Sequence, residues 1–264
     1  MTKKIRLQNT KTETVIYFCG SLLALLLIWQ LAVSYTSLNK VMPSPVAVFA
    51  FIGSSLTQPI GSEILPIHIL ASLRRVFIGY FLACVIGIPL GIIMGCSRTG
   101  RAIIKPIFEL LRPIPGLAWI PLAILWFGIG ESSKYYIICV SAIVSIILNA
   151  YSGASQVDPT LVGAAKMLGA KRTQIFLFIT LPASVPQIFA GLQVGLSSSW
   201  MAVIAAEMIR ADEGAGWIIT TGMESGNTVQ ILAGMISIGL VGLILASLLR
   251  LLERGLCSWN IQGR

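Results

Sequence analysis

Long apolar runs separated by short polar segments dominate the pattern along the chain. Each run is close to the roughly 20 residues that a helix needs to cross a bilayer. Their hydrophobicity is nearly continuous rather than alternating, which favours helices over the strands of a membrane barrel. The predicted spans are Thr14–Tyr35, Ala71–Cys96, Ile107–Ile129, Tyr135–Tyr151, Pro186–Ile209 and Val229–Leu249. The pattern predicts an all-α polytopic membrane protein with about six transmembrane helices.

Smaller features refine this outline. Pro45–Gln58 is apolar but too short to span, and predicts a helix lying flat at the interface. Gly214–Gly222 is compatible with a short re-entrant turn, a surface turn or a plain loop. The prolines Pro113, Pro115 and Pro121 predict that the third span is broken or bent.

Glycines recur every fourth residue in two of the predicted spans. Gly87, Gly91 and Gly95 lie in the second span, and Gly191 and Gly195 in the fifth. This spacing leaves bare backbone on one helix face and permits close helix–helix approach. We expect packing within the chain here rather than a dimer seam.

Composition supports a membrane protein. The chain has 264 residues, of which 56% are hydrophobic and 11% charged, whereas soluble domains carry about 25% charged residues. This argues against a cytosolic enzyme, a disordered protein and a nucleic-acid binder. The run Val15–Val33 is longer than the about 7–15 residues of a signal-peptide core, so we expect an uncleaved first span.

The basic residues behind the formal net charge of +9 are distributed as the predicted topology requires. With the N-terminus in the cytoplasm, most basic residues fall on the inner side, as cytoplasmic loops require. Arg74 and Arg75 are the exception, and we expect them to reach the outer headgroups. The inner set is Lys3, Lys4, Arg6, Lys11, Arg98, Arg101, Lys105, Arg112, Lys166, Lys171, Arg172, Arg250, Arg254 and Arg264. The outer set is Lys40, Arg74, Arg75, Lys134 and Arg210.

Cysteine and histidine usage points to no metal or disulfide chemistry. The five cysteines are odd in number and show no CxxC spacing, so we expect small buried apolar side chains. They are Cys19, Cys84, Cys96, Cys139 and Cys257. His68 is the only histidine and has no Cys partner nearby in the sequence. We therefore expect no metal site.

The sequence predicts no catalytic residue. It contains no GxSxG, HExxH or paired-carboxylate pattern. Gly95 and Gly100 have the glycine spacing of a P-loop, but Arg101 and Ala102 replace the required Lys and Ser/Thr. A predicted membrane helix rather than a strand precedes them, so nucleotide binding on this chain is rejected.

The long inner segment Gln156–Ala183 carries the strongest local signals. Asp158 can cap a helix, and Pro159 suits its first position. Gly169 can supply a left-handed stop. The alternative is a bare surface loop. The two predicted helices are Thr160–Leu168 and Lys171–Ile179.

The spacing in this segment has a counterpart in a known family. Gly163-Ala164-Ala165 is followed after three residues by Gly169, and after nine more by Ile179-x-Leu181-Pro182. This resembles the EAA loop of permease subunits of binding-protein-dependent ABC importers. The departure is Gly163 where the family usually has Glu, which removes any ion pair that this carboxylate makes with the ATPase.

Other segments resemble the taurine, alkanesulfonate and nitrate permease subfamily, and the resemblance runs from Pro43 to the C-terminus. The segments are Pro43–Pro45, Arg112–Pro115, Leu117–Leu122, Trp126–Glu131 and Ala205–Ile209. The resemblance implies a type I ABC importer permease with both termini cytoplasmic, in the bacterial cytoplasmic (inner) membrane. It divides the chain into a cytoplasmic N-terminus (1–13), four spans (14–153), the EAA coupling loop (154–184), two spans (185–250) and a cytoplasmic tail (251–264).

The resemblance also implies partners and a cargo. The expected partners are two ABC ATPase subunits, which carry ATP and Mg, an extracytoplasmic substrate-binding protein, a second permease copy and membrane lipid, but no nucleic acid. No cofactor is expected on this chain. The expected cargo is a small oxyanion, first an organic sulfonate such as taurine. Nitrate, bicarbonate or a vitamin precursor are alternatives within the family.

Two groups of candidate site residues follow. The ATPase-coupling loop comprises Gly163, Ala164, Ala165, Gly169, Lys171, Arg172, Leu181 and Pro182. The candidate translocation pathway comprises Glu109, Arg112, Pro113, Ser197, Ser198, Ser199, Trp200 and Glu207. Ionisable residues at membrane depth are functional candidates by default.

Simpler roles remain open for these residues. Glu109 and Arg112 are spaced to pair on one helix, and the serines can make polar helix–helix contacts. Lys171 and Arg172 can be solvated surface charges, and Glu207 can cap an outer gate.

Two other protein classes remain alternatives. A stand-alone channel or secondary transporter would be favoured by inverted repeats and a midplane ion site, neither of which is evident. A membrane-embedded enzyme would need a convergent His, Asp or Glu cluster.

Overall fold

The computed structural model describes residues 11–256. In that range the regular elements are helices, apart from one isolated bridge between Ile60 and Glu63. This confirms the all-α prediction. The expectations for Lys3, Lys4, Arg6, Cys257 and Arg264 lie outside the described residues.

Five helices are long and apolar enough to cross a membrane. The fourth of them is extended at its start by a short helix and a turn, so that this span runs over Arg172–Ile209. They confirm five of the six predicted spans, although most begin earlier than hydropathy alone predicted. These helices are α1 (Lys11–Tyr35), α3 (Leu65–Cys96), α6 (Glu131–Ser155), α9 (Leu181–Ile209) and α11 (Thr228–Leu256).

The predicted third span is a sharply bent pair of helices, in line with the prediction from its prolines. It consists of α4 (Arg98–Leu111), the 3₁₀ turn η2 (Gly116–Trp119) and α5 (Ile120–Phe127), with a bend of 84° between the halves. Pro113 and Pro115 lie in the break, where neither can donate a backbone hydrogen bond. The predicted start at Ile107 was wrong, because Ser97 caps α4 by accepting a hydrogen bond from the Gly100 amide.

Short helices cover the outer ends of the spans. After the 3₁₀ turn η1 (Ser37–Lys40), α2 (Pro45–Ser55) confirms the predicted short helix. α10 (Ala215–Glu224) occupies Gly214–Gly222, so the expectation of a turn or loop was wrong. Its Ile218 and Ile219 are buried, and this burial stabilises a helix in place of a loop.

The core lies between α3, α6 and α9, and glycines permit the close packing. A Cβ atom added to Gly91 of α3 would lie 2.6 Å from the Ala150 Cβ of α6. One added to Gly191 of α9 would lie 2.6 Å from the Asn149 Cβ, also on α6. Both glycine series therefore serve packing within the chain, as predicted.

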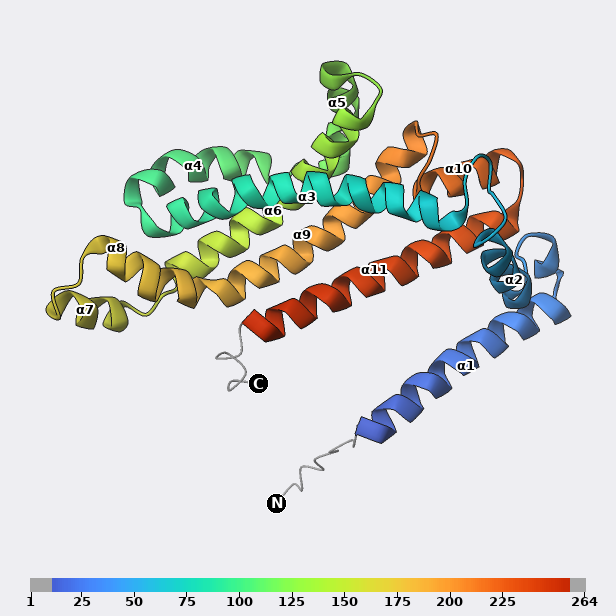
Figure 1. The fold of residues 1–264 in the computed structure, drawn as a ribbon, viewed down its shortest axis with the longest axis horizontal. Helices are drawn as coiled ribbons and strands as arrows, with labels where there is room; N and C mark the ends of the chain where they lie inside the picture. Colours follow the sequence, from blue (N-terminus) through green and yellow to red (C-terminus); the bar gives the residue numbers. More distant parts are fainter. Residues whose placement is uncertain (1–10, 257–264) are drawn as a thin grey trace.

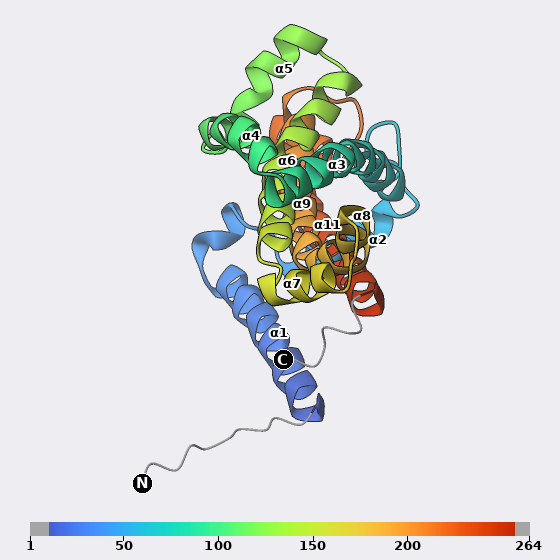
Figure 2. The same cartoon turned by 90° about the vertical axis from the view of Figure 1, so that its left-hand side faces the viewer.

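α1 stands apart from this core in both views (Figures 1 and 2). Large apolar side chains such as Phe18 and Ile28 are exposed along it, which suits lipid or another apolar surface. Cys19 on α1 and Cys96 at the end of α3 are also exposed, so the expectation of buried cysteines was wrong for these two.

Candidate functional site

The inner loop begins with a helix whose start is fixed by its sequence. In α7 (Pro159–Met167), the Asp158 carboxylate accepts a hydrogen bond of 2.8 Å from the Thr160 amide. This bond stabilises the ionised carboxylate and lowers the pKa of Asp158. Pro159 occupies the first turn, and Gly169 adopts φ +79° just after the helix. The predicted helix and its left-handed stop are confirmed.

α7 projects from one end of the bundle, opposite the end that carries α2 and α10 (Figure 1). No residue of this fully described helix is buried. Met167 and Leu168 are 85% and 87% exposed, and Ala164 is exposed beside them. Exposed apolar surface of this kind is typical of a site that contacts a partner.

The rest of the loop differs from the prediction of a second separate helix over Lys171–Ile179. A short helix α8 (Arg172–Ile175) passes into a π-helical turn η3 (Phe176–Thr180), which continues directly into α9. Leu181 and Pro182 are thus the first residues of a spanning helix. α8, η3 and α9 therefore form one continuous helical path from the loop into the span.

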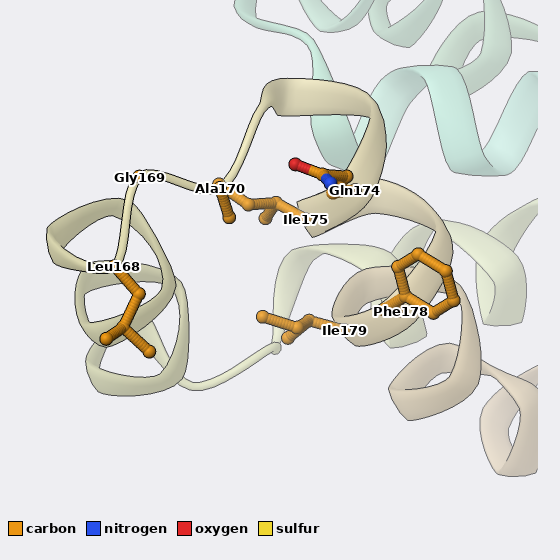
Figure 3. Close-up of a pocket in the computed structure, with 7 residues that line it drawn as sticks. All are labelled: Leu168, Gly169, Ala170, Gln174, Ile175, Phe178 and Ile179. Atoms are coloured by element: carbon orange, nitrogen blue, oxygen red, sulfur yellow. The ribbon is translucent and has the colours of Figure 1, made fainter.

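A shallow cavity of about 320 Å³ separates the end of α7 from η3. Figure 3 shows Leu168 on the α7 side and Phe178 and Ile179 on the η3 side. Leu168 and Phe178 are both largely exposed. This notch is open and of mixed polarity, and of the predicted coupling-loop residues only Gly169 lines it.

The candidate pathway residues on α4 have a local explanation. Arg112 Nη1 lies 3.7 Å from Glu109 Oε2, and both side chains are nearly half exposed. This is the helical pairing that the sequence allowed. Pro113 follows them in the break of the third span.

The candidates on α9 divide between core and surface. Trp200 is buried, and its Nε1 donates to the Ile238 carbonyl of α11 across 3.1 Å. Ser199 is fully buried, Ser198 is half-buried, and Ser197 is exposed. Helix packing therefore accounts for Trp200, and only Ser197 of this group is open to the surface.

Glu207 belongs to a buried ionic cluster that the sequence analysis missed. Arg75 on α3 donates from Nη1 to Glu207 Oε1 at 2.8 Å and from Nε to Glu131 Oε2 at 2.8 Å. Its Nη2 lies 3.3 Å from Glu213 Oε1. The expectation that Arg75 reaches the headgroups was wrong, because only 2% of its side chain is exposed. Arg74 is exposed, as expected.

Hydrogen bonds extend the cluster to the start of α10. The Glu207 carboxylate also accepts from Ser72 Oγ at 2.8 Å and from the Gly216 amide at 3.0 Å. His68 Nδ1 accepts from the Gly214 amide at 3.2 Å. Gly214 has φ +127°, and a Cβ there would collide with the Glu207 carboxylate. The cluster thus ties α3, α6, α9 and α10 together at one end.

One sequence signal could have revealed this cluster. Arg75 lies well inside an apolar helix, where a charge requires a partner, while Glu131 and Glu207 stand at the ends of two other spans. Within residues 11–256, no group of three or more His, Cys, Asp or Glu side chains is placed to hold a metal ion.

Several apolar helices of spanning length, a sharply bent helix pair and a projecting helical inner loop are the features expected of a membrane transport permease. The chain belongs to the family described as "Binding-protein-dependent transport system inner membrane component", which matches residues 87–256. It is an ABC importer permease of the taurine and nitrate subfamily, and so a multi-pass membrane protein.

Three relatives illustrate this membership. The chain is 38% identical over 253 residues to a putative ABC transporter permease protein of Methanocaldococcus jannaschii, covering 96% of this chain and 94% of the relative. It is 40% identical over 193 residues to the taurine transport system permease protein TauC of Escherichia coli, covering 73% and 70%. It is 36% identical over 256 residues to the nitrate import permease protein NrtB of Synechocystis, covering 95% and 92%.

Solved structures have the same fold. An inward-facing conformation of the MetNI methionine ABC transporter matches with a TM-score of 0.62 and 18% identity, covering 73% of this chain and 95% of that chain. An amino acid ABC transporter with histidines matches with a TM-score of 0.59 and 14% identity, covering 79% and 97%. These matches confirm the type I importer permease fold.

Proposed function

We propose that this chain forms the translocation pathway for a small oxyanion, first an organic sulfonate such as taurine. The observation that carries the proposal is the 40% identity to a taurine permease. Nitrate is the second candidate, because a nitrate permease is 36% identical over nearly the whole chain. The importer works in a bacterial inner membrane, surrounded by lipid.

The energy comes from partner chains in this proposal. Two copies of the permease assemble with two ATPase subunits, which bind ATP and Mg²⁺ and perform hydrolysis. An extracytoplasmic binding protein delivers the cargo at the opposite face. This chain contributes no catalytic group and acts as a two-state element, which its partners bias by contacting one state better than the other.

Docking on the ATPase is assigned to α7. Ala164 is exposed and Ala165 is half-buried, and these small side chains admit close approach by another chain. The left-handed turn at Gly169 directs the chain back towards η3. The notch between Leu168 and Phe178 offers a seat for a partner side chain.

Continuity with a spanning helix supports this assignment. Leu181 and Pro182 begin α9 directly after η3, so a pull on α7 moves α9. Lys171 and Arg172 lie between α7 and η3 and supply positive charge for an acidic patch on a partner or for lipid phosphate. The open space around Gly163 leaves room for the carboxylate that the family usually places there.

The cargo is tested with the partner binding protein. Titration calorimetry with taurine, other alkanesulfonates, nitrate and bicarbonate should reveal tight binding of at least one oxyanion. Preference for taurine over nitrate supports the first assignment, and the reverse order supports the second. Failure to bind any anion would overturn the oxyanion proposal.

A further inference from the structure

A second cavity lies at the outer end of the bundle, at the opposite end from the coupling loop. It has a volume of about 230 Å³ and lies between α5, the start of α6 and the end of α9. Half of the residues that line it are isoleucines, among them Ile124, Ile137 and Ile209. A cavity of this size suits a ligand of a few heavy atoms, because drug-sized ligands occupy about 300–1,000 Å³.

The charged side chains that line this cavity, among residues 11–256, are both cations. Lys134 comes from the first turn of α6 and Arg210 from the residue that ends α9. Only 9% of the Lys134 side chain is exposed, and its Nζ donates one hydrogen bond of 2.9 Å to Glu131 Oε1. An ammonium has three donors, so Lys134 retains further capacity.

Arg210 is exposed, and within residues 11–256 no carboxylate lies within ion-pair distance of it. Asp212 follows two residues later but does not line the cavity. The planar guanidinium offers paired donors that match the geometry of an oxyanion.

The neighbouring carboxylates are already engaged by other partners. Glu131 accepts hydrogen bonds from both Arg75 and Lys134. Glu207 accepts from Ser72, Arg75 and the Gly216 amide. Neither carboxylate lines the cavity wall. Although these acids balance the cluster as a whole, the residues that line the cavity are two cations, Ser133 and apolar residues.

The start of α6 adds to the positive character of the cavity. Gly130 lines it and precedes the first residue of this 25-residue helix without providing a side-chain cap. The amides of the first helical turn have no partner within the helix, and the helix dipole places partial positive charge there.

We propose that this cavity is an entry site for the transported oxyanion. Lys134 and Arg210 bind the charged oxygens, and the isoleucine wall receives the apolar part of a sulfonate or the flat face of nitrate. The site stands at the outer ends of the spans, where cargo arrives before it enters the pathway. This inference rests on the proposed function and adds the residues that select an anion.

The test uses the complete importer in proteoliposomes, with taurine and nitrate as labelled probes. Arg210→Gln removes the exposed cation without disturbing the buried cluster, and Lys134→Gln leaves Glu131 paired with Arg75. Arg74→Gln is the matched control, because Arg74 is exposed at the same end but does not line the cavity. Arg210→Lys tests rescue by charge alone.

We expect each glutamine variant to lower the initial uptake rate about tenfold at subsaturating probe concentration. The reason is that each variant loses one charge-assisted hydrogen bond to the anion. Arg74→Gln should match the wild type, and Arg210→Lys should recover part of the rate. The binding-protein concentration that half-maximally stimulates ATP hydrolysis should stay unchanged, because docking is not altered.

Wild-type rates in Arg210→Gln and Lys134→Gln would overturn the entry site while leaving the proposed function intact. The entry site would also be overturned if Arg210→Gln weakened the affinity for the binding protein but gave normal uptake at saturating binding protein. Arg210 would then serve docking of the binding protein. A wild-type importer that moves neither taurine nor nitrate would instead remove the proposed function, and this inference with it.

Discussion

Arg75 and Glu207 form a salt bridge of 2.8 Å between two helices, 132 residues apart in the sequence. Both side chains are almost completely buried. Charges removed from water are costly unless they are paired and hydrogen-bonded. This pair is satisfied on both sides, so it fixes α3 against α9 at the outer end of the bundle.

Replacing Arg75 with Leu should destabilise the protein strongly. The substitution leaves Glu207 buried without its cation, which typically costs about 3–5 kcal/mol. Thermal unfolding of the purified chain in detergent should show the loss as a lower midpoint. The control is Arg74→Leu, whose side chain is 58% exposed and whose nearest carboxylate is 3.9 Å away. Equal midpoints for the two variants would contradict the account of the cluster.

Gly91 should tolerate no side chain. Gly91→Ala places a Cβ 2.6 Å from both the Ala150 Cβ and the Ile147 carbonyl oxygen, and such overpacking costs about 1–3 kcal/mol. Gly239→Ala on α11 meets no atom within 4 Å and should be neutral or stabilise by up to about 1 kcal/mol. Unfolding midpoints of the two variants measure the contrast. A stable Gly91→Ala variant would show that α3 and α6 are packed less closely than described.

Two acidic substitutions in α7 should differ in their effect on transport. Ala165→Glu introduces a bulky charge on the proposed docking surface and should lower ATP-dependent uptake about tenfold or more, equivalent to about 1.4 kcal/mol of docking free energy. Gly163→Glu introduces the same side chain two positions earlier, where nothing lies within 4 Å of its Cβ. It restores the residue that the family usually has and should leave uptake unchanged or higher.

Uptake and ATP hydrolysis measured together in proteoliposomes distinguish uncoupling from unfolding. Ala165→Glu should retain the wild-type unfolding midpoint, because α7 contributes no buried residue. Unimpaired transport by Ala165→Glu would mean that α7 is not the docking helix.

Gly169 should be sensitive to β-branched residues. Its φ of +79° is unfavourable for an L-residue, and Gly169→Val should cost about 1–2 kcal/mol locally. The strain shifts the turn between α7 and α8, so we expect weaker coupling of ATP hydrolysis to uptake. Gly163→Val is the control, since Gly163 lies within α7 and its φ is not positive. Equal coupling in both variants would show that the turn at Gly169 is not needed for docking.

The spans and the inner helix could be predicted because their causes are local. Continuous apolar runs require helices in lipid, and Asp158, Pro159 and Gly169 carry the start and stop signals of α7 themselves. The break at Pro113 and Pro115 follows from missing amide donors in the same way. The resemblance in the inner loop then led to the family, which the comparisons confirmed.

The outer cluster could not be predicted in the same way because its partners are distant. Arg75 meets Glu131 and Glu207 only after three helices have packed. α10 was missed because its stability comes from burying Ile218 and Ile219 against other helices rather than from its own glycine-rich sequence. The merging of α8 and η3 into α9 depends likewise on the context of the bundle.

The central claim is that this chain is the permease of an ATP-driven importer for a small oxyanion, and uptake by the reconstituted complex tests it most directly. Proteoliposomes should hold the permease with its ATPase, and binding protein should be added outside with labelled taurine or nitrate. The account predicts accumulation that requires both ATP inside and binding protein outside. Uptake by the permease alone, independent of ATP and of both partners, would contradict the account and indicate a channel or secondary transporter.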